Sequence, residues 1–222
     1  MLATAADSGT TDIVATPHFN SQYSYDLDIV ERRIEEVIRN ATSSLRIYRG
    51  CEFHLTPDTI GALCVAPSQY TINRTTYLLV DLDVNPIKID EPFLCKAIDA
   101  GLIPIIAHPE RNPRLQKAFD RLEWWIEIGC LLQVTASAIT GEFGRAALSA
   151  AQELLQRGMV AVMASDSHDG VYRRPRLTEA YAAVAELLGE VSADLLLTRN
   201  PGAVLRGEPV ETLPRPKEKV FR

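Results

Sequence analysis

The strongest constraint on the fold is an alternation of short β-branched runs with longer amphipathic runs along the whole chain. The β-branched runs predict strands at Asp12–Thr16, Leu45–Gly50, Thr76–Val80, Ile103–Ala107, Leu131–Thr135 and Val160–Ala164. Apolar residues at helical spacing predict helices between them, namely from Leu27 to Ile38 and over Glu91–Ala100, Leu115–Ile128, Phe143–Arg157 and Leu177–Leu188. Such alternation is typical of a parallel sheet flanked by helices, either open or closed into a barrel.

Most of the predicted strands run directly into polar side chains that are able to take part in catalysis. These side chains belong to His18, Glu52, Asp81, Asp83, His108, Glu110, Arg111, Asp166 and His168. The carboxyl ends of successive strands converge on one mouth in a β/α barrel, whereas a doubly wound sheet gathers reactive residues at its switch point. The distribution of these residues over many strands therefore favours the barrel.

Three of these histidines and three of the carboxylates form a candidate metal-ligand set, namely His18, Glu52, Asp81, His108, Asp166 and His168. Nitrogen and oxygen ligands without thiolate suit manganese, iron or zinc. More than four candidate ligands indicate more than one ion, and paired ions activate water for phosphoryl transfer. The alternative is that each polar residue only caps a helix or lines a loop.

Two arginines accompany this set. Arg111 follows His108 by three residues, and Arg173 follows His168 by five. A guanidinium next to a metal centre is suited to binding two oxygens of a phosphate. The alternative for Arg173 is a solvated basic loop that includes Arg174 and Arg176. Glu110 is expected to pair with a nearby arginine, and His54 is given a lesser role near Glu52.

Composition and motif searches remove several other classes of protein. A net charge of −6 argues against binding to nucleic acid or to an anionic membrane. No apolar run approaches the roughly 18 residues of a membrane span. The four cysteines show no C-x-x-C spacing, which favours a reduced, cytoplasmic protein. Neither a phosphate-binding glycine loop nor a G-x-S-x-G or C-x-x-x-x-x-R motif occurs, so phosphatase chemistry has to depend on metal.

Several segments taken together resemble one known family. They are Val14-Ala-Thr-Pro-His18, Gly50-Cys-Glu-Phe-His-Leu-Thr-Pro-Asp58, Ile106-Ala-His-Pro-Glu-Arg-Asn112, Leu132-Gln-Val-Thr-Ala-Ser137, Gly141-Glu-Phe-Gly144, Ala164-Ser-Asp-Ser-His168 and Asn200-Pro-Gly-Ala-Val-Leu-Arg-Gly207. That family is the bacterial metal-dependent tyrosine phosphatases of the polymerase-and-histidinol-phosphatase (PHP) superfamily, found in capsule and exopolysaccharide operons. The resemblance implies a distorted, TIM-like, seven-stranded β/α barrel. It also implies hydrolysis of phosphotyrosine on a bacterial tyrosine kinase that regulates polysaccharide export.

The resemblance also assigns roles to individual residues. His18, Glu52, His108, Asp166 and His168 match the family's metal ligands, and Asp81 stands where the family usually has a bridging glutamate. Arg111 and Arg173 match arginines that bind the substrate phosphate, so with His108 they form the expected catalytic set. The implied cofactor is Mn²⁺, or Fe, Zn or Mg in its place, with two to three ions in the complete family site.

One expected family motif is absent from this sequence. Family members begin with a strand that carries Asp-x-His-x-His, while Met1–Gly9 resembles the end of the helix that follows that strand. The expectation is therefore a single PHP domain over 1–207 that lacks its first strand, and a flexible tail over 208–222. With fewer ligands, this chain is expected to hold fewer ions.

Three functions are consistent with the sequence. The first is an active phosphotyrosine phosphatase, and the second is a non-catalytic fragment or pseudoenzyme. The third keeps the fold but acts on a small phosphate ester such as histidinol phosphate. The segments Gly50–Asp58 and Leu132–Gly144 favour the first. The expected partner is the phosphotyrosine-bearing kinase. Neither nucleic-acid binding nor membrane insertion is expected, and the oligomeric state is left open.

Overall fold

A computed structural model describes residues 1–41, 44–82 and 90–214. Asp83, one of the strand-end residues noted above, lies outside the described residues. The strands are β1 (Asp12–Ala15), β2 (His18–Phe19), β3 (Arg46–Arg49), β4 (Glu52–His54), β5 (Tyr77–Asp81), β6 (Ile103–Ala107), β7 (Leu131–Thr135) and β8 (Val162–Ala164). All pairings between them are parallel, in the order β2-β4-β5-β6-β7-β8, with β1 and β3 forming a separate pair.

The segments β1 and β2 are two halves of one interrupted strand, and so are β3 and β4. The interruption lies at Pro17 on the first strand and at Gly50 on the second. A Cβ atom on Gly50 would stand 2.8 Å from Cγ1 of Val14, so the two strands approach more closely there than a side chain allows. The bend changes the direction of both strands, after which His18 and Glu52 lie opposite each other in register.

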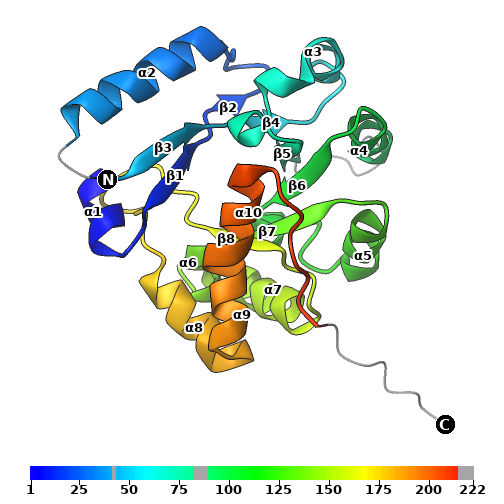
Figure 1. The fold of residues 1–222 in the computed structure, drawn as a ribbon. Coiled ribbons are helices and arrows are strands. Elements are labelled where there is room, and N and C mark those ends of the chain that lie inside the picture. Colours follow the sequence, from blue (N-terminus) through cyan, green and yellow to red (C-terminus); the bar gives the residue numbers. More distant parts are fainter. Residues whose placement is uncertain (42–43, 83–89, 215–222) are drawn as a thin grey trace.

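Helices cover the outside of the sheet (Figure 1). The longer ones are α2 (Leu27–Asn40), α4 (Asp90–Asp99), α5 (Phe119–Glu127), α7 (Gly144–Gln156) and α8 (Thr178–Leu188). The shorter helices are α1 (Leu2–Asp7), α3 (Ile60–Val65), α6 (Ala136–Ile139), α9 (Glu190–Asp194) and α10 (Asn200–Arg206). Single turns occur at Pro67–Gln69, Ile72–Arg74 and Pro109–Arg111, and a π-helical turn spans Leu195–Arg199. None of the helices within the described ranges has the length and apolar character needed to span a membrane.

The core lies between the sheet and the helices. One continuous apolar cluster forms this core, and many of its side chains are fully buried. Among them are Phe53, Leu94, Leu122, Trp125 and Leu132. Burial of apolar surface on this scale is the main contribution to stability in such a domain. The polar ends of the strands are thereby held in place by a close-packed interior.

The predicted parallel α/β fold is confirmed, and β6 and β7 have the expected bounds. No pairing between β8 and β1 or β2 is found within the described ranges. The two ends of the sheet nevertheless approach each other, because the ring centroids of His18 and His168 are 5.7 Å apart. The sheet is therefore strongly curved, with a shared mouth at its carboxyl edge.

Two predictions from the sequence fail. Helix α5 begins at Phe119 rather than at Leu115, because the side chain of Asn112 accepts a hydrogen bond from the backbone N–H of Arg114 and forms a turn. Residues 208–214 are not loosely held: Leu213 is 3% exposed, and Glu211 is hydrogen-bonded to Asn200. The rest of the predicted tail lies outside the described residues.

Candidate active site

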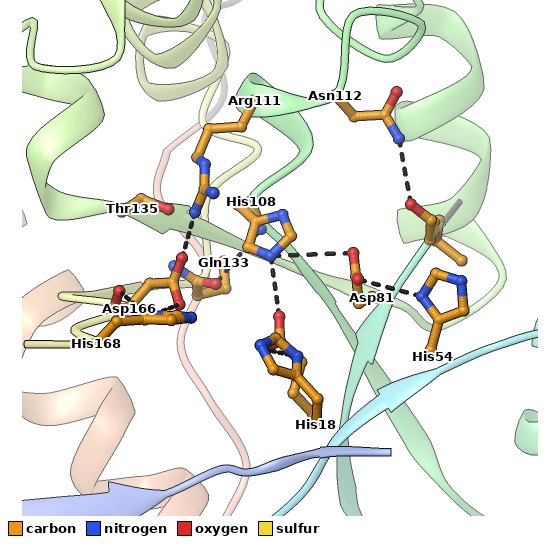
Figure 2. Close-up of polar contacts among 12 residues, drawn as sticks. His18, His54, Asp81, His108, Arg111, Asn112, Gln133, Thr135, Asp166 and His168 are labelled. Carbon is orange, nitrogen blue, oxygen red and sulfur yellow. Dashed lines mark hydrogen bonds and ion pairs between the residues drawn. The ribbon is translucent and has the colours of Figure 1, made fainter. Parts of the chain in front are cut away.

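The predicted site residues gather at the carboxyl edge of the sheet (Figure 2). Asp81 ends β5, the loop after β6 carries His108 and Arg111, and the loop after β8 carries Asp166, His168 and Arg173. His18 and Glu52 are the first residues of the short strands β2 and β4. The site residues form two neighbouring groups. One is centred on the carboxylate of Glu52 and the other on the carboxylate of Asp166.

Glu52 is the centre of the first group. Its side chain is 5% exposed, and both carboxylate oxygens have histidine partners. Oε2 lies 3.0 Å from Nδ1 of His18, and Oε1 lies 2.9 Å from Nε2 of His108. A buried carboxylate is stable only where hydrogen bonds or a cation compensate for lost hydration. Here two imidazoles meet that need.

Asp81 completes the first group. Its Oδ2 atom lies 3.2 Å from Nδ1 of His54, and its Oδ1 atom lies 3.9 Å from Nε2 of His108. Burial favours the neutral form of Asp81, but the hydrogen bond from His54 and the nearby histidines outweigh burial and lower its pKa. Burial likewise disfavours protonated His108, yet the carboxylates of Glu52 and Asp81 raise its pKa overall.

The first group has the geometry of a metal site. One ligand atom each from Glu52, Asp81 and His108 lies within 4.8 Å of the other two. Two carboxylates and an imidazole are a donor set that suits manganese, iron or zinc. His18 is also within reach, since its ring contacts the same carboxylate of Glu52. These residues therefore fit the metal that the sequence predicts.

The second group joins two arginines to one carboxylate. Nη1 of Arg111 and Nη2 of Arg173 both donate hydrogen bonds to Oδ2 of Asp166. Nδ1 of His168 lies 3.1 Å from the backbone oxygen of Asp166 and 3.7 Å from its Oδ1 atom. The guanidinium of Arg111 stacks 4.3 Å above the ring of Phe143. Arg173 therefore lies against Asp166 in the structure, and its role in binding phosphate stays a prediction.

Local backbone geometry explains how the loops present these side chains. His108 and Asp166 both have left-handed backbone, with φ of 37° and 47°. His108 is the first residue after β6, and Asp166 is the second residue after β8, so the chain turns sharply where each strand ends. After His108, the Pro109–Arg111 turn is closed by a hydrogen bond from the N–H of Arg111 to the oxygen of His108. This turn brings Arg111 back over the mouth of the sheet.

Among the residues that the structure describes, Glu110 has no arginine partner, in contrast to the expectation from the sequence. Its side chain is fully buried, and its Oε1 atom accepts a hydrogen bond from the backbone N–H of Thr135, 2.9 Å away. Burial raises the pKa of this carboxyl group, although the N–H of Thr135 opposes the effect. Glu110 therefore joins the loop after β6 to the end of β7.

Two residues in the site were not given a defined role from the sequence. His54 contacts Asp81, and Gln133 accepts a hydrogen bond from the backbone N–H of His108 through its Oε1 atom, at 3.4 Å. His54 lies two residues after Glu52 in β4, and Gln133 lies two residues before Thr135 in β7. Alternation within a strand was the available signal, because residues two apart point to the same face.

Known proteins with similar sequences are consistent with a phosphatase site of this geometry. Residues 1–206 match the family described as "Capsular polysaccharide synthesis, CpsB/CapC". The CapC protein of Staphylococcus aureus is 33% identical over 180 residues, which cover 79% of this chain and 70% of CapC. The tyrosine-protein phosphatase CpsB of Streptococcus pneumoniae is 26% identical over 215 residues, covering 92% of this chain and 88% of CpsB.

A solved structure agrees with these matches. It belongs to a study of YwqE from Bacillus subtilis and CpsB from Streptococcus pneumoniae, which are described as unique metal-dependent tyrosine phosphatases. The two folds superimpose with a TM-score of 0.87 at 25% identity, over 97% of this chain and 88% of the solved one. The tyrosine-protein phosphatase YwqE itself is 24% identical over 95% of this chain and 84% of its own length.

Proposed function

Since the chain belongs to the CpsB/CapC family of capsular polysaccharide synthesis proteins, we propose that it is a metal-dependent phosphatase that hydrolyses phosphotyrosine. The observation that carries this proposal is the position of the Glu52–Asp81–His108 cluster beside two arginines that converge on Asp166. A divalent cation and two guanidinium groups are what a phosphate dianion and its transition state require.

The metal would be held first by Glu52, Asp81 and His108, with His18 adjacent. Asp166 and His168 complete the ligand set that we propose for a further ion, and we take manganese as the metal, with two to three ions in a complete site. When bound, such ions supply an activated water and Lewis-acid stabilisation of the phosphoryl oxygens. His54 orients Asp81 through its hydrogen bond, as residues behind metal ligands commonly do.

Arg111 and Arg173 would hold the phosphoryl group of the substrate. Each guanidinium uses one Nη atom on Asp166 and retains further N–H donors. Nε of Arg173 is buried and has no hydrogen-bond partner in the described part of the chain. Planar guanidinium groups recognise phosphate with two parallel hydrogen bonds, so the pair is suited to fixing the phosphorus in line with the attacking water.

The rim of the site supports a tyrosyl substrate on a protein rather than a small ester. Tyr23 is 58% exposed and its ring lies 6.5 Å from the ring of His18. Val171 and Tyr172, 59% and 84% exposed, directly precede Arg173. Exposed aromatic and apolar residues around a polar site favour a large partner. We propose that this partner is a bacterial tyrosine kinase of the polysaccharide pathway, in the cytoplasm, where the four free cysteines stay reduced.

The test is turnover of a phosphotyrosine peptide by the purified chain with added Mn²⁺, in parallel with histidinol phosphate. We expect release of phosphate from the peptide, a slower reaction with histidinol phosphate, and loss of activity on chelation. Arg111→Met should lower kcat/KM by about two orders of magnitude, because a charged hydrogen bond to the transition state is lost. Arg206→Met, which changes an exposed arginine of α10, is the matched control and should leave turnover unchanged.

Three results would contradict the proposal. Faster turnover of histidinol phosphate would assign the site to small phosphate esters. Metal binding without hydrolysis of either substrate would indicate a non-catalytic protein. Equal losses in the Arg111 and Arg206 variants would show that the arginine pair has no special role.

A further inference from the structure

Gln133 is a buried polar residue in the middle of the site. It lies on β7, between β6, which leads to His108, and β8, which leads to Asp166 (Figure 2). Its exposed fraction is 4%, and it is opposite Ala107 and Val162 in the two neighbouring strands. The neighbours are small or apolar, so neither supplies a side-chain hydrogen-bond partner for its amide.

The orientation of this amide follows from one contact. The backbone N–H of His108 donates a hydrogen bond, so the atom of Gln133 that faces it must be the carbonyl Oε1, at 3.4 Å. The NH₂ group is then directed away from His108. Over the described residues, Nε2 is buried and has no hydrogen-bond partner. An unsatisfied buried donor destabilises the folded state, and such a group in a native structure calls for a functional explanation.

Side-chain donors in the two groups already have hydrogen-bond partners, in contrast to Nε2 of Gln133. Arg111 and Arg173 are both committed in part to Asp166, and His108 contacts Glu52. The amide of Gln133 is neutral, so it adds a donor between the two groups without adding a charge that would compete for either carboxylate. Figure 2 shows Gln133 beside both groups, so its amide is placed where a phosphoryl group bridging them would lie.

We propose that Nε2 of Gln133 donates a hydrogen bond to a non-bridging oxygen of the substrate phosphoryl group. This inference rests on the proposed phosphatase function and adds a third, uncharged donor to the two arginines. Its carbonyl meanwhile holds the left-handed backbone of His108 in place. Gln133 thus contacts the substrate and also fixes the strand end that carries a metal-binding side chain.

Two substitutions separate the contact with substrate from the contact with His108. Gln133→Glu keeps a carbonyl-type acceptor for the N–H of His108 but replaces the NH₂ donor with an oxygen that repels phosphate. Gln133→Met has a similar length and removes both functions. Gln152→Glu on α7, an exposed glutamine, makes the same change in net charge away from the site and is the matched control.

Two measurements are needed on protein loaded with Mn²⁺ to equal metal content. The first is the affinity for inorganic phosphate by calorimetry, and the second is kcat/KM for a phosphotyrosine peptide. We expect Gln133→Glu to weaken phosphate binding about tenfold or more, and Gln133→Met about three- to tenfold, as expected for loss of one hydrogen bond to an anion. Both variants should lower kcat/KM in the same order, and Gln152→Glu should match the wild type.

The proposal is overturned if either Gln133 variant binds phosphate as the wild type does. A purely structural role would give a normal Gln133→Glu protein and a damaged Gln133→Met protein, which is the reverse order. If Gln133→Glu does not fold, Gln133→Met decides through two affinities. Weaker phosphate binding at an unchanged affinity for Mn²⁺ supports the contact with phosphate, whereas unchanged phosphate binding, or a loss in proportion to the Mn²⁺ affinity, overturns it. Phosphate binding that depends on Gln133, in a protein that does not hydrolyse phosphotyrosine, would refute the proposed function while retaining the phosphate contact.

Discussion

At the scale of single residues, the site depends on two side chains with an unusual backbone. His108 and Asp166 have positive φ values, which cost non-glycine residues of order 1–3 kcal/mol each unless the surroundings hold them. The surroundings do so in both cases. The N–H of His108 is bonded to Gln133 and the carboxylate of Asp166 is bonded to two arginines. Strain is therefore located where two strands deliver functional groups to the same mouth.

The four free cysteines should differ sharply in reactivity. Cys64 is exposed, Cys95 is half-buried, and Cys51 and Cys130 are buried. Burial raises the pKa of Cys130 to about 12 and that of Cys51 still further, so neither forms a thiolate near neutral pH. We expect one fast-reacting thiol, that of the exposed Cys64, with a disulfide reagent at about pH 8.

Labelling kinetics and mass spectrometry check this prediction. The Cys64→Ser variant should lose the fast phase. In the wild type, all four thiols should react once the protein is unfolded in denaturant. A fast phase that persists in Cys64→Ser would show that Cys95 or one of the two buried cysteines is accessible.

The ion pair between β1 and β3 should make a pH-dependent contribution to stability. Both Nε and Nη2 of Arg46 lie 2.7 Å from the carboxylate of Asp12, and this hydrogen bonding lowers the pKa of Asp12 from 3.8 to about 2 despite partial burial. A carboxyl group with a lowered pKa in the folded state stabilises the protein above its unfolded pKa. That contribution is lost as the pH falls from about 4 towards 2.

Urea unfolding of the wild type and Asp12→Asn at several pH values tests this sign. The wild type should be more stable between about pH 5 and 7 by a small amount, because Arg46 is exposed and water screens the pair. The difference should shrink below about pH 4. A difference that grows on acidification would contradict the assignment.

At the scale of elements, the loop after β8 is shaped by one aspartate. Oδ1 of Asp169 accepts hydrogen bonds from the backbone N–H groups of Val171 and Tyr172, both at 2.6 Å, and of Arg173 at 3.3 Å. The oxygen of Arg173 in turn accepts hydrogen bonds from the N–H groups of His168 and Asp169. The loop is thereby closed, and Arg173 is directed at Asp166.

Asp169→Ala should therefore weaken substrate binding without removing any group that contacts substrate. We expect KM for a phosphotyrosine peptide to rise roughly three- to tenfold, with a smaller change in kcat, because Arg173 loses its fixed position. Asp169→Asn retains an oxygen acceptor and should stay close to the wild type. Steady-state kinetics on both variants decide the matter, and equal behaviour of the two would remove the proposed role of the Asp169 turn.

The sequence predicts elements well where the pattern is local. The apolar runs Ile103–Ala107 and Leu131–Thr135 each follow a glycine and precede polar residues, so their bounds could be predicted. The late start of α5 could not, because the apolar residue Leu115 fits a helix by periodicity but lies in a turn made by the side chain of Asn112. Local side-chain hydrogen bonds override periodicity in such cases.

The same distinction applies to the site. Polar residues at strand ends predict that His18, Glu52, His108 and Asp166 come together, because parallel topology brings strand ends to one edge. The contacts of His54 with Asp81 and of Gln133 with His108 depend on the register of β4 against β5 and of β6 against β7. Register is fixed by packing of the whole sheet, which a single sequence does not specify.

At the scale of the whole molecule, the candidate active site and the contacts of the final described segment lie at opposite ends of the sheet. The site occupies the carboxyl ends of the strands, whereas the final described segment covers their amino ends. Tyr77, at the start of β5, donates a hydrogen bond to the backbone oxygen of Glu208. Leu213 packs into the main core cluster, near Gly158. Residues 208–214, the described part of the predicted tail, therefore lie against the amino ends of the strands.

Asn200 is the residue that fastens this segment, and its removal should separate stability from activity. Its side chain is 1% exposed; Nδ2 donates to the oxygens of Ala161 and Glu211 at 2.7 and 2.8 Å, and Oδ1 accepts from the N–H of Glu211 at 3.0 Å. Asn200→Ala leaves these buried groups unpaired, so we expect the free energy of unfolding to fall by roughly 2–4 kcal/mol.

Activity should respond differently from stability. Because Ala161 precedes β8 and the site follows it, kcat/KM of Asn200→Ala should equal the wild-type value well below the melting temperature. Denaturant unfolding and steady-state kinetics on the same preparation measure the two quantities, with exposed Asn40→Ala as the control for loss of an asparagine. A parallel loss of kcat/KM in folded Asn200→Ala would show that the two ends of the sheet are coupled, because close-packed strands can transmit a displacement at one end to the catalytic groups at the other.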